Sequence, residues 1–283
     1  MTAADERAEN ERQLFNGFWP VYEQYGLAPD GFVGASSLRV KRWSAPIAQT
    51  ELPQMVAKLQ TAPDSAILAF CETYGLLGFW ETEWQGVSDL IHALPLVEPR
   101  RDPLAWVRAH ARTVRVCLEL TDALKRKDKA TLERLTTDPT TGYAVRNEIG
   151  QESAPDLLTV KWPLHLDVDR RSLQTRARWL RAALINPNIR TIHRVVNVRL
   201  DGTEQSFFHF HAQIEVVYWH LANVIDGGIV GRCKRPGCGA FFIQRHKSQE
   251  YCAPKYAQRE SPCALWVRQR RLGQPKTKKR ITK

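Results

Sequence analysis

Four cysteines near the end of the chain constrain its fold more than any other feature. Cys233, Cys238, Cys252 and Cys263 follow the spacing Cys-x4-Cys-x13-Cys-x10-Cys. Between the first two, the pair Pro236-Gly237 predicts a tight turn that brings both thiolates back toward one another. Zinc is held in proteins by a tetrahedron of soft or borderline ligands, and such a turn lets two thiolates reach one ion. We therefore expect these four cysteines to bind a zinc ion (Zn2+).

The identity of the fourth ligand stays open at this point. Cys263 completes a four-thiolate set, although its spacing is long, and His246 is the other candidate. Ser261 and Pro262 have the pattern of an N-cap and a first helical residue, so Cys263 would lie in the first turn of a final helix, where the positive end favours thiolate. We expect Phe241 and Phe242 to pack beneath the ion. Two further cysteines, Cys71 and Cys117, stand alone in apolar segments and are expected to be buried small hydrophobes.

The positive charge of the chain is concentrated in the same region. The whole chain of 283 residues carries a net charge of +11, whereas residues 232–283 alone hold 15 Lys and Arg against two Glu, a net +13. The rest is slightly acidic. Such asymmetry predicts a polyanionic partner, nucleic acid rather than a membrane surface; a solubilising tail is the alternative. The candidate nucleic-acid-binding residues are Arg232, Lys234, Arg235, Arg245, Lys247, Arg259, Arg268, Arg270 and Arg271.

The segment resembles a known family. Its matching residues are Arg232, Cys233, Pro236, Cys238, Gly239, Phe242, Tyr251, Cys252, Arg259 and the basic run Arg268 to Arg271. On these, residues 229–272 resemble the CGNR-type zinc finger and the related finger RCxxPxCGxxFxxxxxxxxYCxxxCxxR of bacterial proteins considered transcriptional regulators. Upstream, residues 74–78 are similar to their YGxLG-like element. The CGNR tetrapeptide is absent, and Tyr256 holds the place of the family's fourth ligand. The resemblance implies DNA binding and transcription regulation in a bacterium.

The pattern of the chain predicts an α+β fold in three parts. Residues 1–228 are expected to form a mainly helical domain with a small β-hairpin or sheet, residues 229–272 a zinc finger with a basic helix, and residues 273–283 a disordered basic tail. Helical spacing appears in residues 50–60, 63–80, 103–127, 129–137, 172–185 and 212–226. A possible strand over residues 157–168 and a hairpin around Asp201-Gly202 supply the sheet. Residues 30–50 are mixed, and could form a hairpin or a loop.

Helix ends are suggested by particular side chains. Asp64 and Ser65 are expected to begin the 63–80 helix and Gly75 to end or kink it. Asp102 is a good N-cap for the next helix, with Pro103 at its first position. Ile214, Val217, Leu221 and Val224 fall on one face of the helix over residues 212–226.

Several function classes lack a sequence signal. The polar N-terminus and the lack of 18 consecutive apolar residues predict a cytoplasmic protein without a membrane partner. No Walker, GxGxxG, HExxH or GxSxG motif is found, so no reaction is suggested and we expect a protein that is not an enzyme. His209 and His211 share one side of a predicted strand and could bind a metal as a pair, but sheet-face or pocket-lining residues are the commoner case.

The expected function is therefore a zinc-dependent regulator that contacts DNA, more readily than RNA, through its finger and basic helix. The larger domain could sense a small molecule or form a homodimer. The alternatives are an RNA-binding protein, an enzyme whose finger serves recruitment, and a protein-interaction module.

Overall fold

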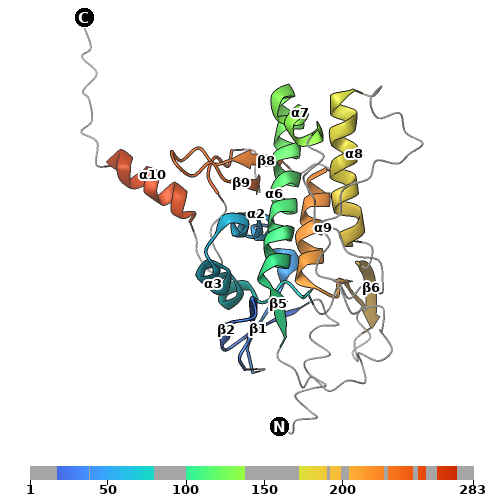
Figure 1. Cartoon of the computed structure of the whole chain (residues 1–283), viewed down its shortest axis with the longest axis vertical. Coiled ribbons are helices and arrows are strands. Elements are labelled where there is room, and N and C mark those ends of the chain that lie inside the picture. Colours follow the sequence, from blue (N-terminus) through green and yellow to red (C-terminus); the bar gives the residue numbers. More distant parts are fainter. Residues whose placement is uncertain are drawn as a thin grey trace, which may run out of the picture.

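Figure 1 shows the computed structural model of the chain. The structure describes residues 18–37, 39–79, 100–137, 172–189, 192–198, 204–225, 229–244, 248–252 and 260–272. The predicted α+β class is confirmed, because helices form most of the body and the strands pair into small antiparallel sheets. Among the described helices, none has the length and apolar character needed to cross a membrane.

The N-terminal part of the body contains five short strands in two sheets. β1 (Trp19–Tyr22) pairs antiparallel with β4 (Val40–Ser44). β2 (Tyr25–Ala28), β3 (Phe32–Ala35) and β5 (Arg101–Pro103) form the second sheet in that order. Each strand has three to five residues, too few for a clear period-two pattern. For this reason the sequence of residues 30–50, which contains β3 and β4, predicted only a hairpin or a loop.

The helices surround one long central helix, α6 (Leu104–Arg126). The others are η1 (Pro46–Ala48), α2 (Leu52–Ala57), η2 (Lys58–Thr61), α3 (Asp64–Tyr74), α7 (Lys129–Thr137), α8 (Leu173–Ile185), η5 (Asn186–Ile189) and α9 (Gln213–Ile225). α2, η2, α7, α8 and α9 all contact α6 (Figure 1). The predicted helix over 103–127 is confirmed, and residues from every part of the body meet in its core.

The start of α6 differs from the prediction. Asp102 lies in β5 and is not the N-cap; the capping position belongs to Pro103, which makes no side-chain capping bond. The carboxylate of Asp102 instead accepts hydrogen bonds from the backbone N–H groups of Leu77, Gly78 and Phe79. This buried carboxylate therefore binds the N–H groups of a turn 25 residues earlier in the chain and does not cap its own helix.

The predicted helix over residues 63–80 is shorter than expected. α3 ends at Tyr74, where Gly75 takes a positive φ of 92° and its N–H donates to the carbonyl of Cys71 at 2.8 Å. Pro63, rather than Asp64 or Ser65, holds the N-cap position. Asp64 is the first helical residue and pairs with Arg108 of α6.

The paired strands of the predicted hairpin around Asp201-Gly202 are confirmed, and so is the predicted helix over residues 212–226. β6 (His193–Val198) pairs antiparallel with β7 (Glu204–His209), and the turn at residues 199–203 lies outside the described residues. All four members of the predicted apolar stripe on α9 are buried, namely Ile214, Val217, Leu221 and Val224. The possible strand over residues 157–168 also lies outside the described part of the chain.

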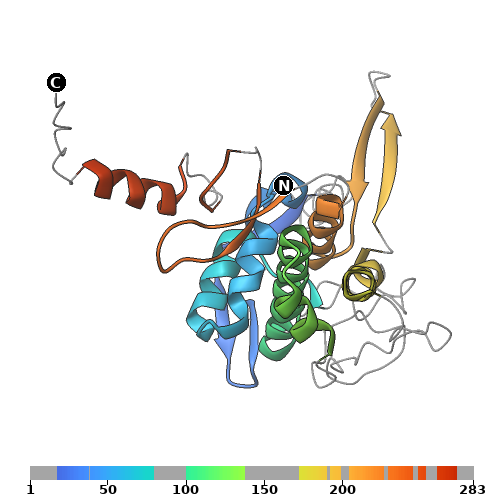
Figure 2. The ribbon, with the colours of Figure 1, turned by 90° about the horizontal axis from the view of Figure 1, so that it is seen from above.

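The cysteine-rich region begins with a short hairpin. β8 (Ile229–Arg232) pairs antiparallel with β9 (Phe241–Gln244), and this hairpin contacts α6 and α2. Val230 belongs to the main core. α10 (Pro262–Leu272) follows the last cysteine, and Figures 1 and 2 both show it projecting away from the body. We call residues 229–272 the knuckle region.

Candidate metal centre and nucleic-acid interface

The structure brings four sulfur atoms into one cluster. The sulfur atoms of Cys233, Cys238, Cys252 and Cys263 all lie within 4.8 Å of one another. Three separations are 3.5 Å between Cys238 and Cys252, 3.7 Å between Cys238 and Cys263, and 3.8 Å between Cys252 and Cys263. A tetrahedral ion with bonds of about 2.3 Å to sulfur has sulfur–sulfur edges of about 3.8 Å. All four cysteines are free thiols, so the cluster has the size and donor set of a metal site.

Backbone hydrogen bonds hold the first three cysteines in place. The N–H of Cys233 donates to the carbonyl of Ala240 at 2.9 Å, and the N–H of Cys238 donates to the carbonyl of Arg235 at 3.1 Å. These bonds close the turn between the first two ligands. The N–H of Lys234 donates to the carbonyl of Glu250 at 3.0 Å, which aligns the arm carrying Cys252 beside the turn.

The surroundings shift the pKa values of three thiols in different directions. Burial raises the pKa of Cys233 and of Cys252. Burial also acts on Cys238, but an N–H from Ala240 and the neighbouring thiols outweigh it and lower the pKa of Cys238. A metal must be bound by thiolates, so binding here displaces protons and becomes stronger as pH rises.

The fourth sulfur comes from the start of α10. Cys263 is its second residue, and the Oγ of Ser261 accepts the N–H groups of Cys263 at 3.2 Å and Ala264 at 3.4 Å. The predicted cap and the predicted position of Cys263 in the first turn are therefore confirmed. His246, the other candidate ligand, lies outside the described residues, as does Tyr256. The cluster thus joins α10 to the body through a side chain in its first turn.

Only one of the two phenylalanines lies beneath the cysteines. Phe242 is buried against the sulfur cluster. Phe241 packs against the main core instead, so the expectation for that residue is wrong. Neighbouring residues of a strand point to opposite faces. In β9, Phe242 therefore faces the cysteine cluster and Phe241 faces the main core.

The candidate nucleic-acid-binding residues divide into two groups. Three of them make contacts within the knuckle region. Arg232 donates to the carbonyl of Gly239 at 3.2 Å, Lys234 forms an ion pair with Glu250 at 2.6 Å, and the guanidinium of Arg235 lies 4.9 Å from the ring centre of Trp266. Trp266 therefore connects α10 to the turn between the first two cysteines.

The second group lies along α10. Arg268 is exposed and pairs with Glu260 at 3.1 Å, while Arg270 is exposed with its guanidinium 5.2 Å from the Trp266 ring. Arg271 is also part of α10. Arg245, Lys247 and Arg259 lie outside the described residues. The helix thus presents arginines on a surface that is not packed against the body (Figure 2).

The histidine pair has no third potential metal ligand beside it among the residues that the structure describes. The rings of His209 and His211 lie 4.8 Å apart. However, within the described residues the cysteine cluster is the one group of three or more His, Cys, Asp or Glu side chains that could share an ion. His211 also lies in the bend after β7, where its N–H donates to the carboxylate of Glu215. The backbone N–H of His211 thus links this bend to the first turn of α9.

Sequence reasoning missed a set of basic side chains on the helical body that face the knuckle region. Lys58, Arg115, Arg126 and Arg134 come from η2, α6 and α7 and line one hollow together with Arg232. No stretch of sequence contains them as a motif, because α6 and α7 place them side by side only after packing.

Comparisons with protein-family models, with curated proteins and with solved structures found no match to this chain.

Proposed function

We propose that the cysteine cluster binds zinc and that the knuckle region and α10 bind nucleic acid, duplex DNA in preference to RNA, as a regulator of transcription. One observation carries this proposal: the ion-sized sulfur cluster includes a residue in the first turn of a projecting helix that bears exposed arginines. The resemblance of residues 229–272 to CGNR-type fingers of bacterial regulators agrees with it. The proposal assigns no chemical reaction to the chain.

The donor set favours zinc. Four thiolates in a tetrahedron suit zinc or iron, whereas magnesium and calcium prefer oxygen ligands. Zinc has no redox chemistry and in closed four-thiolate sites it serves structure. Here it would hold together the β8–β9 hairpin, the arm carrying Cys252 and the first turn of α10. Among the described residues, none of α10 belongs to the main core.

The geometry of α10 suits a nucleic-acid groove. A helix that projects from a protein can enter the major groove of DNA, where arginine side chains contact phosphates and bidentately contact guanine edges. Arg268 and Arg270 are exposed on α10, and each phosphate that such a residue neutralises makes binding more sensitive to salt.

The metal is tested by elemental mass spectrometry on protein purified without added metal. We expect about one zinc per chain, and a large loss in Cys252→Ser. Cys71→Ala is the matched control, because Cys71 is a buried thiol outside the cluster, and it should keep its zinc. Iron in place of zinc, or no metal, would refute the zinc assignment.

DNA binding is tested by fluorescence anisotropy with a labelled duplex and a labelled RNA hairpin at several salt concentrations. We expect the double variant Arg268→Gln, Arg270→Gln to weaken duplex binding and to reduce the log–log salt slope by about 2, since each lost phosphate contact removes about 0.9. The control is Arg39→Gln, Arg194→Gln, which changes two exposed arginines of the body, one just before β4 and one in β6. Equal effects of the two double variants would contradict the proposal, and tighter binding of the RNA would favour the RNA-binding alternative.

These point substitutions are better than deletion of residues 229–283. Val230 and Phe241 are part of the main core, so the deletion would expose apolar surface of α6 and disturb the body as well as the knuckle region.

A further inference from the structure

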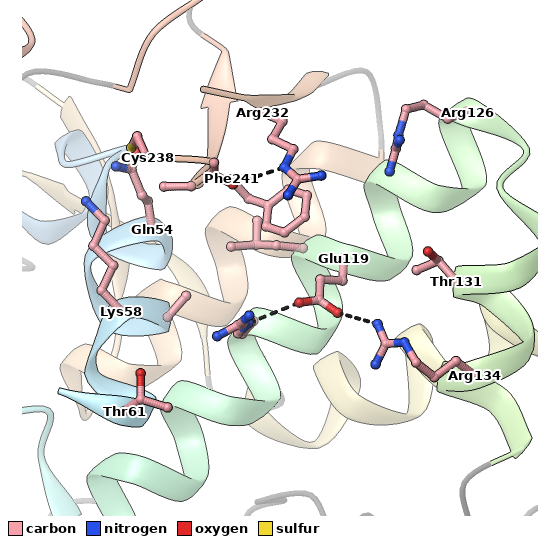
Figure 3. A pocket seen from close by; sticks show the side chains of 15 residues that line it. Gln54, Lys58, Thr61, Glu119, Arg126, Thr131, Arg134, Arg232, Cys238 and Phe241 are labelled. Carbon is pink, nitrogen blue, oxygen red and sulfur yellow. Dashed lines mark hydrogen bonds and ion pairs between the residues drawn. The ribbon is translucent and has the colours of Figure 1, made fainter. Parts of the chain in front are cut away.

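A basic hollow lies where the knuckle region meets the helical body (Figure 3). It has a volume of about 420 Å³ and is walled by α2, η2, α6 and α7 on one side and by Arg232 and residues 238–241 on the other. This size lies within the range of small-molecule sites, about 300–1,000 Å³. Both parts of the molecule therefore contribute to one cavity.

Positive charge dominates the wall of this hollow. Its described lining contains five cationic side chains and one carboxylate. The cationic residues are Lys58, Arg115, Arg126, Arg134 and Arg232. Arg126 pairs with Asp122 at 2.7 Å, but that carboxylate is not part of the described lining. An anion is the ligand that such a wall favours.

The single carboxylate shows where the arginines converge. Glu119 accepts from Nε of Arg115 at 3.0 Å and from a terminal nitrogen of Arg134 at 3.0 Å. Its side chain is only 15% exposed, and Figure 3 shows it at the centre of the hollow. Two guanidinium groups from different helices thus already face one point, the arrangement with which arginines clamp phosphates.

The wall of the hollow also contains apolar surface. Ala57, Ala240 and Phe241 line it and are partly exposed. Small-molecule sites combine such surface with a few placed polar groups, so this wall favours a ligand that carries more than an inorganic anion.

We propose that this hollow binds a small phosphorylated ligand of the size of a mononucleotide. Its phosphate lies among Arg115, Arg134 and Arg232, and the rest of the ligand packs against Ala57 and Phe241. The site goes beyond the proposed function, because it needs neither α10 nor nucleic acid.

Occupancy of this site would be coupled to the metal centre. Cys238, one of the four sulfur donors, and its neighbours Gly239 and Ala240 form part of the wall. A ligand that contacts them together with α6 and α7 holds the turn against the body. Because coupling between two sites is reciprocal, the ligand tightens metal binding by the factor by which the metal tightens ligand binding.

Isothermal titration calorimetry on the full chain with its bound metal tests the site. The probes are AMP, inorganic phosphate and adenosine. We expect AMP to bind more tightly than phosphate, and adenosine, which lacks the phosphate, to bind at least tenfold more weakly than AMP.

Two substitutions with opposite expected effects separate binding from folding. Arg115→Gln should weaken AMP binding at least tenfold, whereas Glu119→Gln should strengthen it severalfold, because it removes the carboxylate that competes for both arginines. If Arg115 and Glu119 only stabilised the fold, both substitutions would lower the affinity for AMP. Arg39→Gln should leave the affinity for AMP unchanged, because Arg39 is exposed, pairs with Glu23 and does not line the hollow.

The same titrations contain the outcomes that would overturn the proposal. AMP binding that is absent at millimolar concentration, or is unchanged in Arg115→Gln, refutes the site. If AMP does not bind but Arg115→Gln weakens duplex DNA binding, the arginines contact a nucleic-acid backbone and the small-molecule assignment is wrong. Arg268→Gln, Arg270→Gln should retain AMP binding, so failure of the DNA-binding proposal would be distinguishable from failure of this one.

Discussion

The carboxylate of Asp102 accepts the backbone N–H of Leu77 at 2.6 Å. It also accepts the N–H groups of Gly78 at 3.2 Å and Phe79 at 2.8 Å, and Asp102 itself is only 1% exposed. Other parts of the chain bind the same turn: the indole N–H of Trp19 donates to the carbonyl of Leu76 at 2.7 Å. The turn after α3 therefore joins β1 and β5 through hydrogen bonds.

Asp102→Asn should lower the free energy of unfolding by about 1.5–3 kcal/mol, because three buried N–H donors lose a charged acceptor. The measurement is urea unfolding followed by circular dichroism. Asp30→Asn is the control, since Asp30 pairs with Arg101 at an exposed site and such pairs contribute about 0–1 kcal/mol. Equal losses in the two variants would show that Asp102 does not organise the turn.

Gly75→Ala should destabilise the protein by about 3 kcal/mol or more. Gly75 has φ 92° and ψ 178°, a conformation almost confined to glycine, and an added Cβ would lie 2.7 Å from the carbonyl oxygen of Pro20. Strain and overpacking each cost about 1–3 kcal/mol. Gly31→Ala is matched, because Gly31 has φ 83° with nothing within 4 Å of the new atom, and should cost about 1–2 kcal/mol. A smaller loss in Gly75→Ala than in Gly31→Ala would contradict this account.

Ser261→Ala should weaken metal binding about fivefold. The hydroxyl of Ser261 caps α10 and orients Cys263, and loss of a cap costs about 1 kcal/mol, which corresponds to about a fivefold change in a binding constant. Competition with a chromophoric chelator measures it. Ser172→Ala removes the cap of α8, where Ser172 accepts the N–H of Thr175, and should lower thermal stability without changing metal affinity. A metal affinity that is unchanged in Ser261→Ala would show that the cap does not position the ligand.

Acid should destabilise the fold through His110. This histidine is buried, with Nδ1 2.9 Å from the hydroxyl of Tyr218, and burial lowers the pKa of His110 to about 3. An unfolded histidine has a pKa of about 6.5. Between these values the unfolded chain binds a proton that the folded chain does not, so the stability present above pH 6.5 is lost as pH falls. Burial also lowers the pKa of His220, which adds to the effect.

The His110 contribution can be isolated by comparing the wild type with His110→Gln at pH 7 and pH 5. A single group with this shift accounts for about 2 kcal/mol of lost stability at pH 5. The difference between the two pH values should therefore be smaller by about that amount in the variant, whatever its stability at pH 7. If wild type and variant lose the same stability between pH 7 and pH 5, then His110 is protonated in the folded protein at pH 5.

Local signals in the sequence determined the buried face of α9, the start of α10 and the shared site of the cysteines. The apolar stripe of α9 predicted its buried face, because the helical period acts within a dozen residues. The pair Ser261-Pro262 predicted the start of α10 for a similar reason, since capping involves neighbouring residues. The cysteine spacing predicted a shared site, although it left Cys263 and His246 as alternatives for the fourth position.

Tertiary structure alone decided the features that join distant segments. Asp102 has the local pattern of an N-cap, yet three N–H groups of the turn after α3 lie close enough to bind its carboxylate instead. The basic hollow likewise exists only because packing sets α2, α6, α7 and the knuckle region around one space. Local propensity acts between residues near in sequence, whereas competition for a buried partner depends on distances that only the folded chain defines.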